Sequence, residues 1–300
     1  MRYLHLDVFT DTPFEGNQLA VYPDPAPGLS AERMQRIANE MKFSETTFVL
    51  PRERGGDVRM RIFTPHSELP MAGHPTIGTT FALAGLGVIA QGRRAFVFEC
   101  GIGPVPVELE WDEHGLSFAW MTQPPPSFGP DIAARHELAA AIGLDPGSFA
   151  GFPIQVVSCG VPFLFVPIRT RADVDQVTID QRAFTRVVNA SRLEALPSFF
   201  FTMDRTNASG DESVYSRMLA PALGIEEDPA TGGASGPLGC YLVRHGLVPP
   251  DRARSIVSLQ GVAMKRPSRV HISIETRDSE ISRVRVGGKS VLVAEGHLHV

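Results

Sequence analysis

Glu45 is the residue whose setting most directly suggests acid–base chemistry. It lies in the segment Phe43-Ser44-Glu45-Thr46-Thr47-Phe48-Val49-Leu50, where a glutamate enters an otherwise apolar strand. Partial burial raises the pKa of a carboxyl group, so that the group can both accept and donate a proton near neutral pH. Glu45 is therefore a candidate base for proton removal next to a carboxylate or from a diene. The alternative is a surface residue on a strand edge.

Two further polar residues, His74 and Asp228, each come directly before a proline. Proline is favoured in the first helical turn, so both residues are predicted at the start of a helix. N–H groups of a first turn bind anions, and glycine lets a ligand come close. Such glycines follow both residues: Gly78, Gly232 and Gly233. Two helix starts facing one cleft would hold a carboxylate and stabilise an enolate-like charge beside it. The alternatives are a capping or core histidine and an ordinary N-cap aspartate.

Motifs for other chemistries are missing from the sequence. His66 and His74 lack the carboxylate pattern of H-E-x-x-H, so no metal site is predicted. Gly101-Ile102-Gly103 does not complete a dinucleotide fingerprint, and neither a P-loop nor a G-x-S-x-G elbow occurs. The three cysteines are widely separated, which predicts buried free thiols in a reducing compartment.

Composition and charge narrow the class of partner. The 300 residues are 43% hydrophobic, with a formal net charge of -5 and a pI of about 6.0. Neither nucleic acid nor an anionic membrane would be attracted by that charge. No apolar stretch reaches the roughly 18 residues of a membrane-spanning helix, and the first residues do not form a secretory signal. We therefore expect a cytoplasmic protein that acts on a small molecule.

Strands and a few helices must position these residues. Alternating apolar residues predict strands over 3–9, 57–63, 104–110, 154–158, 163–166, 198–202, 269–274 and 283–286. One amphipathic helix is predicted over 31–41, with Ser30 as its N-cap, and another over 131–142. The segments 75–85 and 234–245 are rich in small apolar residues on every side, which is typical of helices buried all round.

Two buried helices among strands suggest two similar domains. The prolines of 122–126 are the best linker, and His74-Pro75-Thr76-Ile77-Gly78 echoes Asp228-Pro229-Ala230-Thr231-Gly232. The predicted domains are residues 1–122, with a return strand at about 287–300, and residues 123–286. The polar stretch 203–213 is predicted to be a loop.

An ordered set of motifs resembles the PhzF-like family of phenazine biosynthesis. The opening run from Asp7 to Val21, which contains Phe14-Glu15-Gly16-Asn17, is similar to the start of such proteins. So are segments around Glu45, His74 and Asp228, and the later segments Gln260-Gly261, Arg266-Pro267-Ser268 and Val284-Arg285-Val286-Gly287-Gly288. The likeness extends over nearly the whole chain.

The resemblance implies an α+β fold of the diaminopimelate epimerase-like type. Such a fold has two pseudo-symmetric domains, each a strand-rich barrel around a central helix. It also implies a homodimer and a cofactor-independent isomerase of a small carboxylate, with trans-2,3-dihydro-3-hydroxyanthranilate as the substrate of the family's best-known member. By the resemblance, Glu45 moves the proton, His74 and Asp228 bind and polarise the substrate, and the other contacts are Asn17, Gly73, Thr231, Gly232 and Gly233.

Two features separate the chain from its relatives. Racemases on this fold use two cysteines, whereas the corresponding places here hold Ala72 and Thr231, which favours a one-carboxylate isomerase. The family often has Ser-Ala where this chain has Gly233-Ala234, and the lost hydroxyl could change the substrate. Two alternatives remain at this point: a non-catalytic small-molecule-binding or scaffold protein, and an epimerase of amino or hydroxy acids.

Overall fold

Strands built from alternating apolar residues dominate the computed structural model, which describes residues 1–193, 196–204, 212–278 and 280–299. All eight predicted strands are present. The chain forms two units, residues 1–122 with 285–300 and residues 123–284. No helix within these described ranges is both long and apolar enough to cross a membrane.

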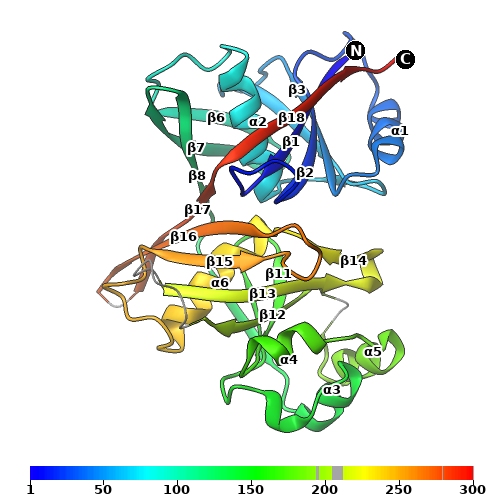
Figure 1. Cartoon of the computed structure of the whole chain (residues 1–300), viewed down its shortest axis with the longest axis vertical. Coiled ribbons are helices and arrows are strands. Elements are labelled where there is room, and N and C mark those ends of the chain that lie inside the picture. Colours follow the sequence, from blue (N-terminus) through cyan, green and yellow to red (C-terminus); the bar gives the residue numbers. More distant parts are fainter. Residues whose placement is uncertain (194–195, 205–211, 279, 300) are drawn as a thin grey trace. The chain divides into compact units, whose positions relative to one another are not determined.

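The first unit is a sheet with one helix on each face. Its strands are β1 (Arg2–Val8), β2 (Asn17–Tyr22), β3 (Glu45–Leu50), β4 (Val58–Phe63), β5 (Glu68–Leu69), β6 (Ala95–Cys100), β7 (Gly103–Asp112), β8 (Gly115–Gln123) and β18 (Ser290–His297). They pair in the order β18, β1, β2, β3, β4, β6, β7, β8, with β5 on β4. Pairs β2–β3 and β4–β6 are parallel. The termini lie together, because the amino group of Met1 donates to the carbonyl of Leu298 over 2.6 Å (Figure 1).

The buried helix of this unit is α2 (Gly73–Gly85), which packs against β1, β2, β3 and β18. A Cβ at Gly78 would lie 2.5 Å from Leu19 and 2.7 Å from Val8, so only glycine lets the helix approach the strands this closely. The second helix, α1 (Ala31–Met41), covers the other face with Met34, Ile37 and Ala38. Its predicted N-cap is confirmed, since the Ser30 side chain accepts from the Arg33 amide over 3.2 Å.

The second unit repeats this plan with more helices. Its strands are β9 (Ser127–Asp131), β10 (Gln155–Ser158), β11 (Pro162–Pro167), β12 (Ser198–Met203), β13 (Glu212–Ala220), β14 (Ile225–Asp228), β15 (Ile256–Gln260), β16 (Ser268–Arg277) and β17 (Glu280–Gly288), the last of which returns the chain to the first unit. Its helices are α3 (Arg135–Ala141), α4 (Arg171–Gln176), α5 (Gln181–Ala190) and α6 (Gly232–Arg244), with single 3-10 turns at Pro146–Ser148 and Pro221–Leu223.

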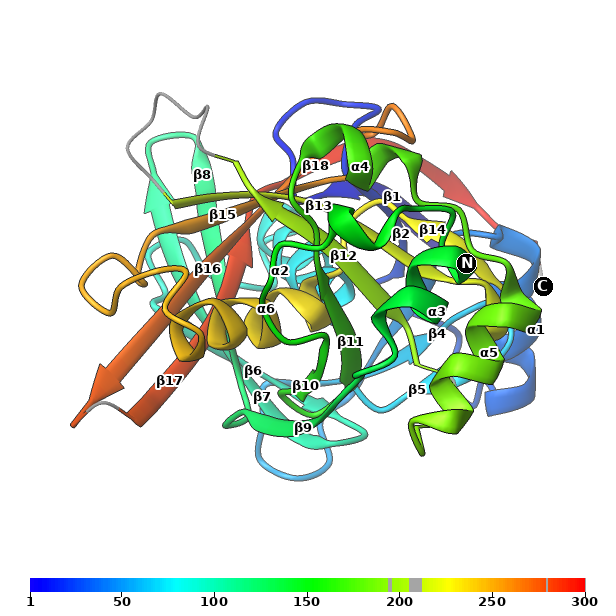
Figure 2. The same cartoon turned by 90° about the horizontal axis from the view of Figure 1, so that it is seen from below.

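Helix α6 is the buried helix of the second unit and contacts β10, β11 and β16. Helices α3 and α5 pack against each other in another part of the same unit (Figure 2). The helix predicted over 131–142 is wrong at its start. Residues 127–131 instead form β9, which pairs with β10, and α3 begins only at Arg135. Of the loop predicted over 203–213, residues 205–211 lie outside the described residues.

The two units share one strand order. In each, a parallel pair (β2–β3 or β11–β12) is followed by an antiparallel pair, a short strand, the buried helix and a second parallel pair (β4–β6 or β13–β15). The predicted echo, however, has the wrong register. Pro75 is the third residue of α2, whereas Pro229 precedes the first residue of α6 by three positions. The residue equivalent to Pro229 is therefore Pro70, three positions before Gly73.

Candidate active site

Glu45 begins β3, directly beside Leu19 of the parallel strand β2. Its side chain is 14% exposed, so the carboxylate is partly buried among apolar strands as predicted. A strand end is a rigid support for a catalytic group, because the strand fixes the backbone while the terminal side chain keeps access to a ligand.

His74 is the second residue of α2 and lies beside Glu45. The His74 ring nitrogen Nε2 is 3.0 Å from Glu45 Oε2, and the ring is buried. Two residues that are far apart in sequence thus meet because α2 packs against β3. The prediction that His74 lies at a helix start is confirmed.

Asn17 orients the other side of the His74 ring. Its side-chain Nδ2 is 3.2 Å from His74 Nδ1, and Asn17 is 0% exposed. In the tautomer with the ring proton on Nε2, Nδ1 accepts from this amide, and Nε2 is the nitrogen near Glu45. The sequence suggested Asn17 as a substrate contact, but the structure places this buried side chain against the histidine.

The same arrangement keeps His74 neutral. Burial lowers its pKa to about 3, and a backbone hydrogen bond with Gln18 acts weakly in the opposite direction. An imidazolium would also point an N–H of Nδ1 at the donating amide of Asn17. The ring is therefore neutral and not a buried cation, with Nε2 3.0 Å from the Glu45 carboxylate.

Gly73 is the first residue of α2, and the N-cap residue is Ala72, whose side chain makes no capping hydrogen bond. A helix start without a capping oxygen leaves first-turn N–H groups for another acceptor, and the helix dipole favours a negative charge there. The described geometry of this helix start is therefore suited to an anion.

In the second unit the candidate residues gather at the start of α6. Thr231 is the N-cap, and Gly232 and Gly233 are the first two helical residues. Asp228 is the last residue of β14 and only 8% exposed, so the prediction that Asp228 lies at the helix N-cap is wrong. The hydroxyl of Thr231 nevertheless joins it to the helix start by donating to Asp228 Oδ2 over 2.5 Å.

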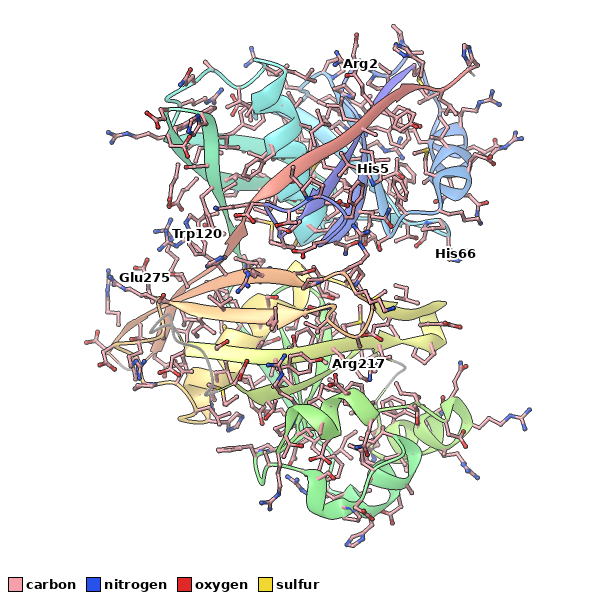
Figure 3. The ribbon with its side chains drawn as sticks, in the orientation of Figure 1. Arg2, His5, His66, Trp120, Arg217 and Glu275 are labelled. Carbon is pink, nitrogen blue, oxygen red and sulfur yellow. The ribbon has the colours of Figure 1, made fainter. Side chains whose placement is uncertain are left out.

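Two residues that sequence reasoning did not assign hold this segment. The side chain of Gln260 bonds both Asp228 and Thr231. Arg217 on β13 forms a two-bond ion pair with Glu227, of 3.0 and 2.8 Å, and donates to carbonyls of the α4 region (Figure 3). The dipeptide Gln260-Gly261 at a strand end was the only signal in the sequence, and it indicated no role.

The described part of the chain contains no cluster of metal-binding side chains, and its cysteines are buried. Within it, no group of three or more His, Cys, Asp or Glu side chains could hold a metal ion. The three cysteines are buried, and burial raises the pKa of Cys100 to about 12.

Comparison with known proteins gives a consistent result. Residues 6–296 match the family model PhzC-PhzF, described as phenazine biosynthesis-like protein. A trans-2,3-dihydro-3-hydroxyanthranilate isomerase of Pseudomonas aeruginosa is 38% identical over 299 residues, which cover 100% of this chain and 99% of that protein.

Solved structures agree with this match. A Bacillus anthracis phenazine biosynthesis protein of the PhzF family superposes with a TM-score of 0.87 at 28% identity, over 100% of this chain and 99% of that one. A probable proline racemase from Agrobacterium radiobacter shares the fold, with a TM-score of 0.68 at 12% identity, over 100% of this chain and 93% of that one. The predicted diaminopimelate epimerase-like fold class is confirmed.

Proposed function

Since the chain belongs to the PhzC-PhzF family of phenazine biosynthesis-like proteins and is an isomerase, we propose that it moves a proton between carbon atoms of a small unsaturated or hydroxylated carboxylate. Glu45 is the acid–base group of this proposal. The step is redox-neutral, because one C–H bond breaks, another forms and the double bond shifts between them. It requires neither a metal nor an organic cofactor.

The observation that supports the proposal most strongly is the set Glu45–His74–Asn17. Asn17 Nδ2 lies 3.2 Å from His74 Nδ1, and the Nε2 of His74 lies 3.0 Å from Glu45 Oε2. With Oε2 oriented in this way, proton exchange with the substrate falls to Oε1. A side chain that is 14% exposed is partly buried and can still reach a ligand, as a group that exchanges protons with a substrate must.

Anion binding in this proposal falls to the two helix starts. Gly73 begins α2, and Gly232 and Gly233 begin α6, so each helix start offers first-turn backbone N–H groups suited to an anionic group of a ligand. Asp228, held by Thr231, is proposed to bind and polarise the substrate in the same reaction.

A two-thiol racemase mechanism is disfavoured by residue type. The N-caps of the two buried helices are equivalent positions in the two units, and they are Ala72 and Thr231. Neither is a thiol, and the buried cysteines lie elsewhere. One carboxylate that both removes and returns the proton therefore fits this chain better.

The proposed substrate is trans-2,3-dihydro-3-hydroxyanthranilate, the compound in the names of three relatives that are 36 to 38% identical. The second helical position is Gly233, which has no side-chain hydroxyl, so a substrate with one hydrogen-bonding group fewer is the nearest alternative.

Steady-state kinetics with this compound test the proposal. Glu45→Gln keeps the size of the side chain but removes the acid–base group, and it is expected to lower kcat by about 100- to 10,000-fold. Glu40→Gln, at an exposed position of α1, is the matched control and should not change kcat. Asp228→Asn should lower kcat/KM. If Glu45→Gln were as active as the wild type, the proposed role would be wrong.

A further inference from the structure

The side chain of Gln260 bridges the segment that holds Asp228. Gln260 ends β15 and is 0% exposed. Its Nε2 donates to the Asp228 carbonyl over 2.7 Å and to the Thr231 hydroxyl over 2.9 Å, and its Oε1 accepts from the Thr231 amide over 3.0 Å. One buried amide thus makes three hydrogen bonds across a four-residue segment.

The direction of the bonds follows from the chemistry of the amide. Nε2 of Gln260 is a donor only, so the Thr231 hydroxyl must accept from it. The hydroxyl has one proton, which it donates to Asp228 Oδ2 at 2.5 Å. Gln260, Thr231 and Asp228 therefore form a one-way chain of hydrogen bonds that ends on a carboxylate oxygen.

The Thr231 hydroxyl is diverted from the usual task of an N-cap. Threonine at this position normally accepts from an amide of the first turn. Here the side chain makes no capping bond, although the Thr231 carbonyl accepts from Ala234 and Ser235. The hydroxyl instead donates to the Asp228 carboxylate and leaves the first turn of α6 without a side-chain cap.

The backbone around Asp228 is fixed on both sides. Arg217 holds the preceding residue, Glu227, through two hydrogen bonds. On the other side, Gly261 has a φ of +75°, and a Cβ there would lie 2.6 Å from the carbonyl oxygen of Pro229. The remaining freedom of Asp228 is therefore that of its side chain, which the Gln260–Thr231 chain restricts.

The first unit shows that the fold itself does not need Gln260. There, Gly101 takes the place of Gly261, since a Cβ on it would lie 2.9 Å from Cα of Pro70, the equivalent of Pro229. The residue before Gly101 is Cys100, and the equivalents of Asp228 and Thr231 are Leu69 and Ala72. The same turn thus forms without any of the three polar side chains.

The second unit in turn has no polar equivalents of Asn17 and His74, the residues that accompany Glu45 in the first unit. Ser198 begins β12 beside Leu164, as Glu45 begins β3 beside Leu19. The first residue of β11 is Pro162, at the place of Asn17, and the second residue of α6 is Gly233, at the place of His74. Each polar set is therefore confined to one of two similarly built turns.

We propose that Gln260 is a positioning residue, which acts through Thr231 to hold the Asp228 carboxylate in a single orientation for the substrate. The inference deepens the proposed function and rests on it for the identity of the substrate. The first unit forms the equivalent turn with Cys100, Ala72 and Leu69. Folding of this turn therefore does not require Gln260, Thr231 and Asp228, which is consistent with a role in the reaction.

Paired variants test the chain of hydrogen bonds. Thr231→Val removes the hydroxyl at constant shape and should lower kcat about 10- to 100-fold relative to Thr231→Ser, the matched variant that keeps the hydroxyl. Gln260→Leu should lower kcat by a similar factor with KM changed less. The double variant Thr231→Val/Gln260→Leu should have the same kcat as the less active of the two single variants, because both substitutions interrupt the same chain of hydrogen bonds.

Hydrogen exchange of the Thr231 amide provides a readout without substrate. The amide donates to Gln260 Oε1, so Gln260→Leu should lose its protection while Thr231→Ser keeps it. Retained protection in Gln260→Leu, or equal activity of Thr231→Val and Thr231→Ser, would overturn the inference. If the wild type did not convert the compound at all, the proposed function would fail, and the protection of Thr231 would alone decide the role of Gln260.

Discussion

The buried neutral His74 should make the protein lose stability as the pH falls. Unfolded, its pKa is the ordinary 6.5, and in the folded protein burial lowers the pKa to about 3. Between these values the unfolded chain binds a proton that the folded protein does not. A group with a depressed folded pKa thus contributes stability above pH 6.5 and loses it as the pH falls toward 3.

The size of the effect follows from the two pKa values. Each pH unit in this window costs about 1.4 kcal/mol, so the free energy of unfolding should fall by about 2 kcal/mol between pH 7.5 and pH 5.0 on account of His74 alone. The side chain is only 5% exposed, so solvent screening takes little from this value.

Urea unfolding at the two pH values measures this loss. The unfolding is monitored with a signal that reports on the first unit, because the two units can unfold separately. His74→Gln cannot titrate, so its loss should be smaller than that of the wild type by about 2 kcal/mol. His114→Gln, whose side chain is 85% exposed, is the matched control and should behave like the wild type. The opposite result, a His74 that stabilises the protein at pH 5.0, would mean an imidazolium paired with Glu45 and would refute the neutral ring.

Three further predictions concern stability and thiol reactivity. Gly261→Ala should lower the free energy of unfolding by more than the control Gly28→Ala does. Gly28 has a similar φ of +77° but open space around it, so its substitution should cost about 1–2 kcal/mol. Denaturant unfolding measures both losses, and equal losses would contradict the close contact at Gly261. Arg217→Met should cost about 3–5 kcal/mol in the same assay because it leaves the partly buried Glu227 unpaired, and a neutral effect would contradict this. The three buried cysteines should not react with a thiol reagent until the protein unfolds, and native labelling that abolishes activity would favour thiol catalysis.

Much of the fold was predictable from local pattern. Strands such as β1 and β16 alternate in the sequence because one face of each is buried, and Ser30 begins α1 because its hydroxyl caps the helix. The start of α3 was not predictable in the same way. Residues 127–131 have no clear alternation, and they form β9 only because β10 offers a partner.

The candidate site was predicted in its residue types and less well in its geometry. Glu45 and His74 were recognised as a set, but their 3.0 Å contact depends on the packing of α2 against β3. The preference of proline for a first turn predicts Asp228 at a helix start, whereas Pro229 here follows directly after the strand β14. Gln260 could not be found from sequence, since its role exists only through a contact with a segment 29 residues away.

The central claim is that Glu45 alone removes and returns the proton. The most direct test follows trans-2,3-dihydro-3-hydroxyanthranilate by NMR in deuterated water, with the wild type and Glu45→Gln side by side. The account predicts isomerisation with deuterium at the newly protonated carbon by the wild type, and neither isomerisation nor deuterium uptake by Glu45→Gln. Turnover with deuterium uptake that survives Glu45→Gln would contradict it.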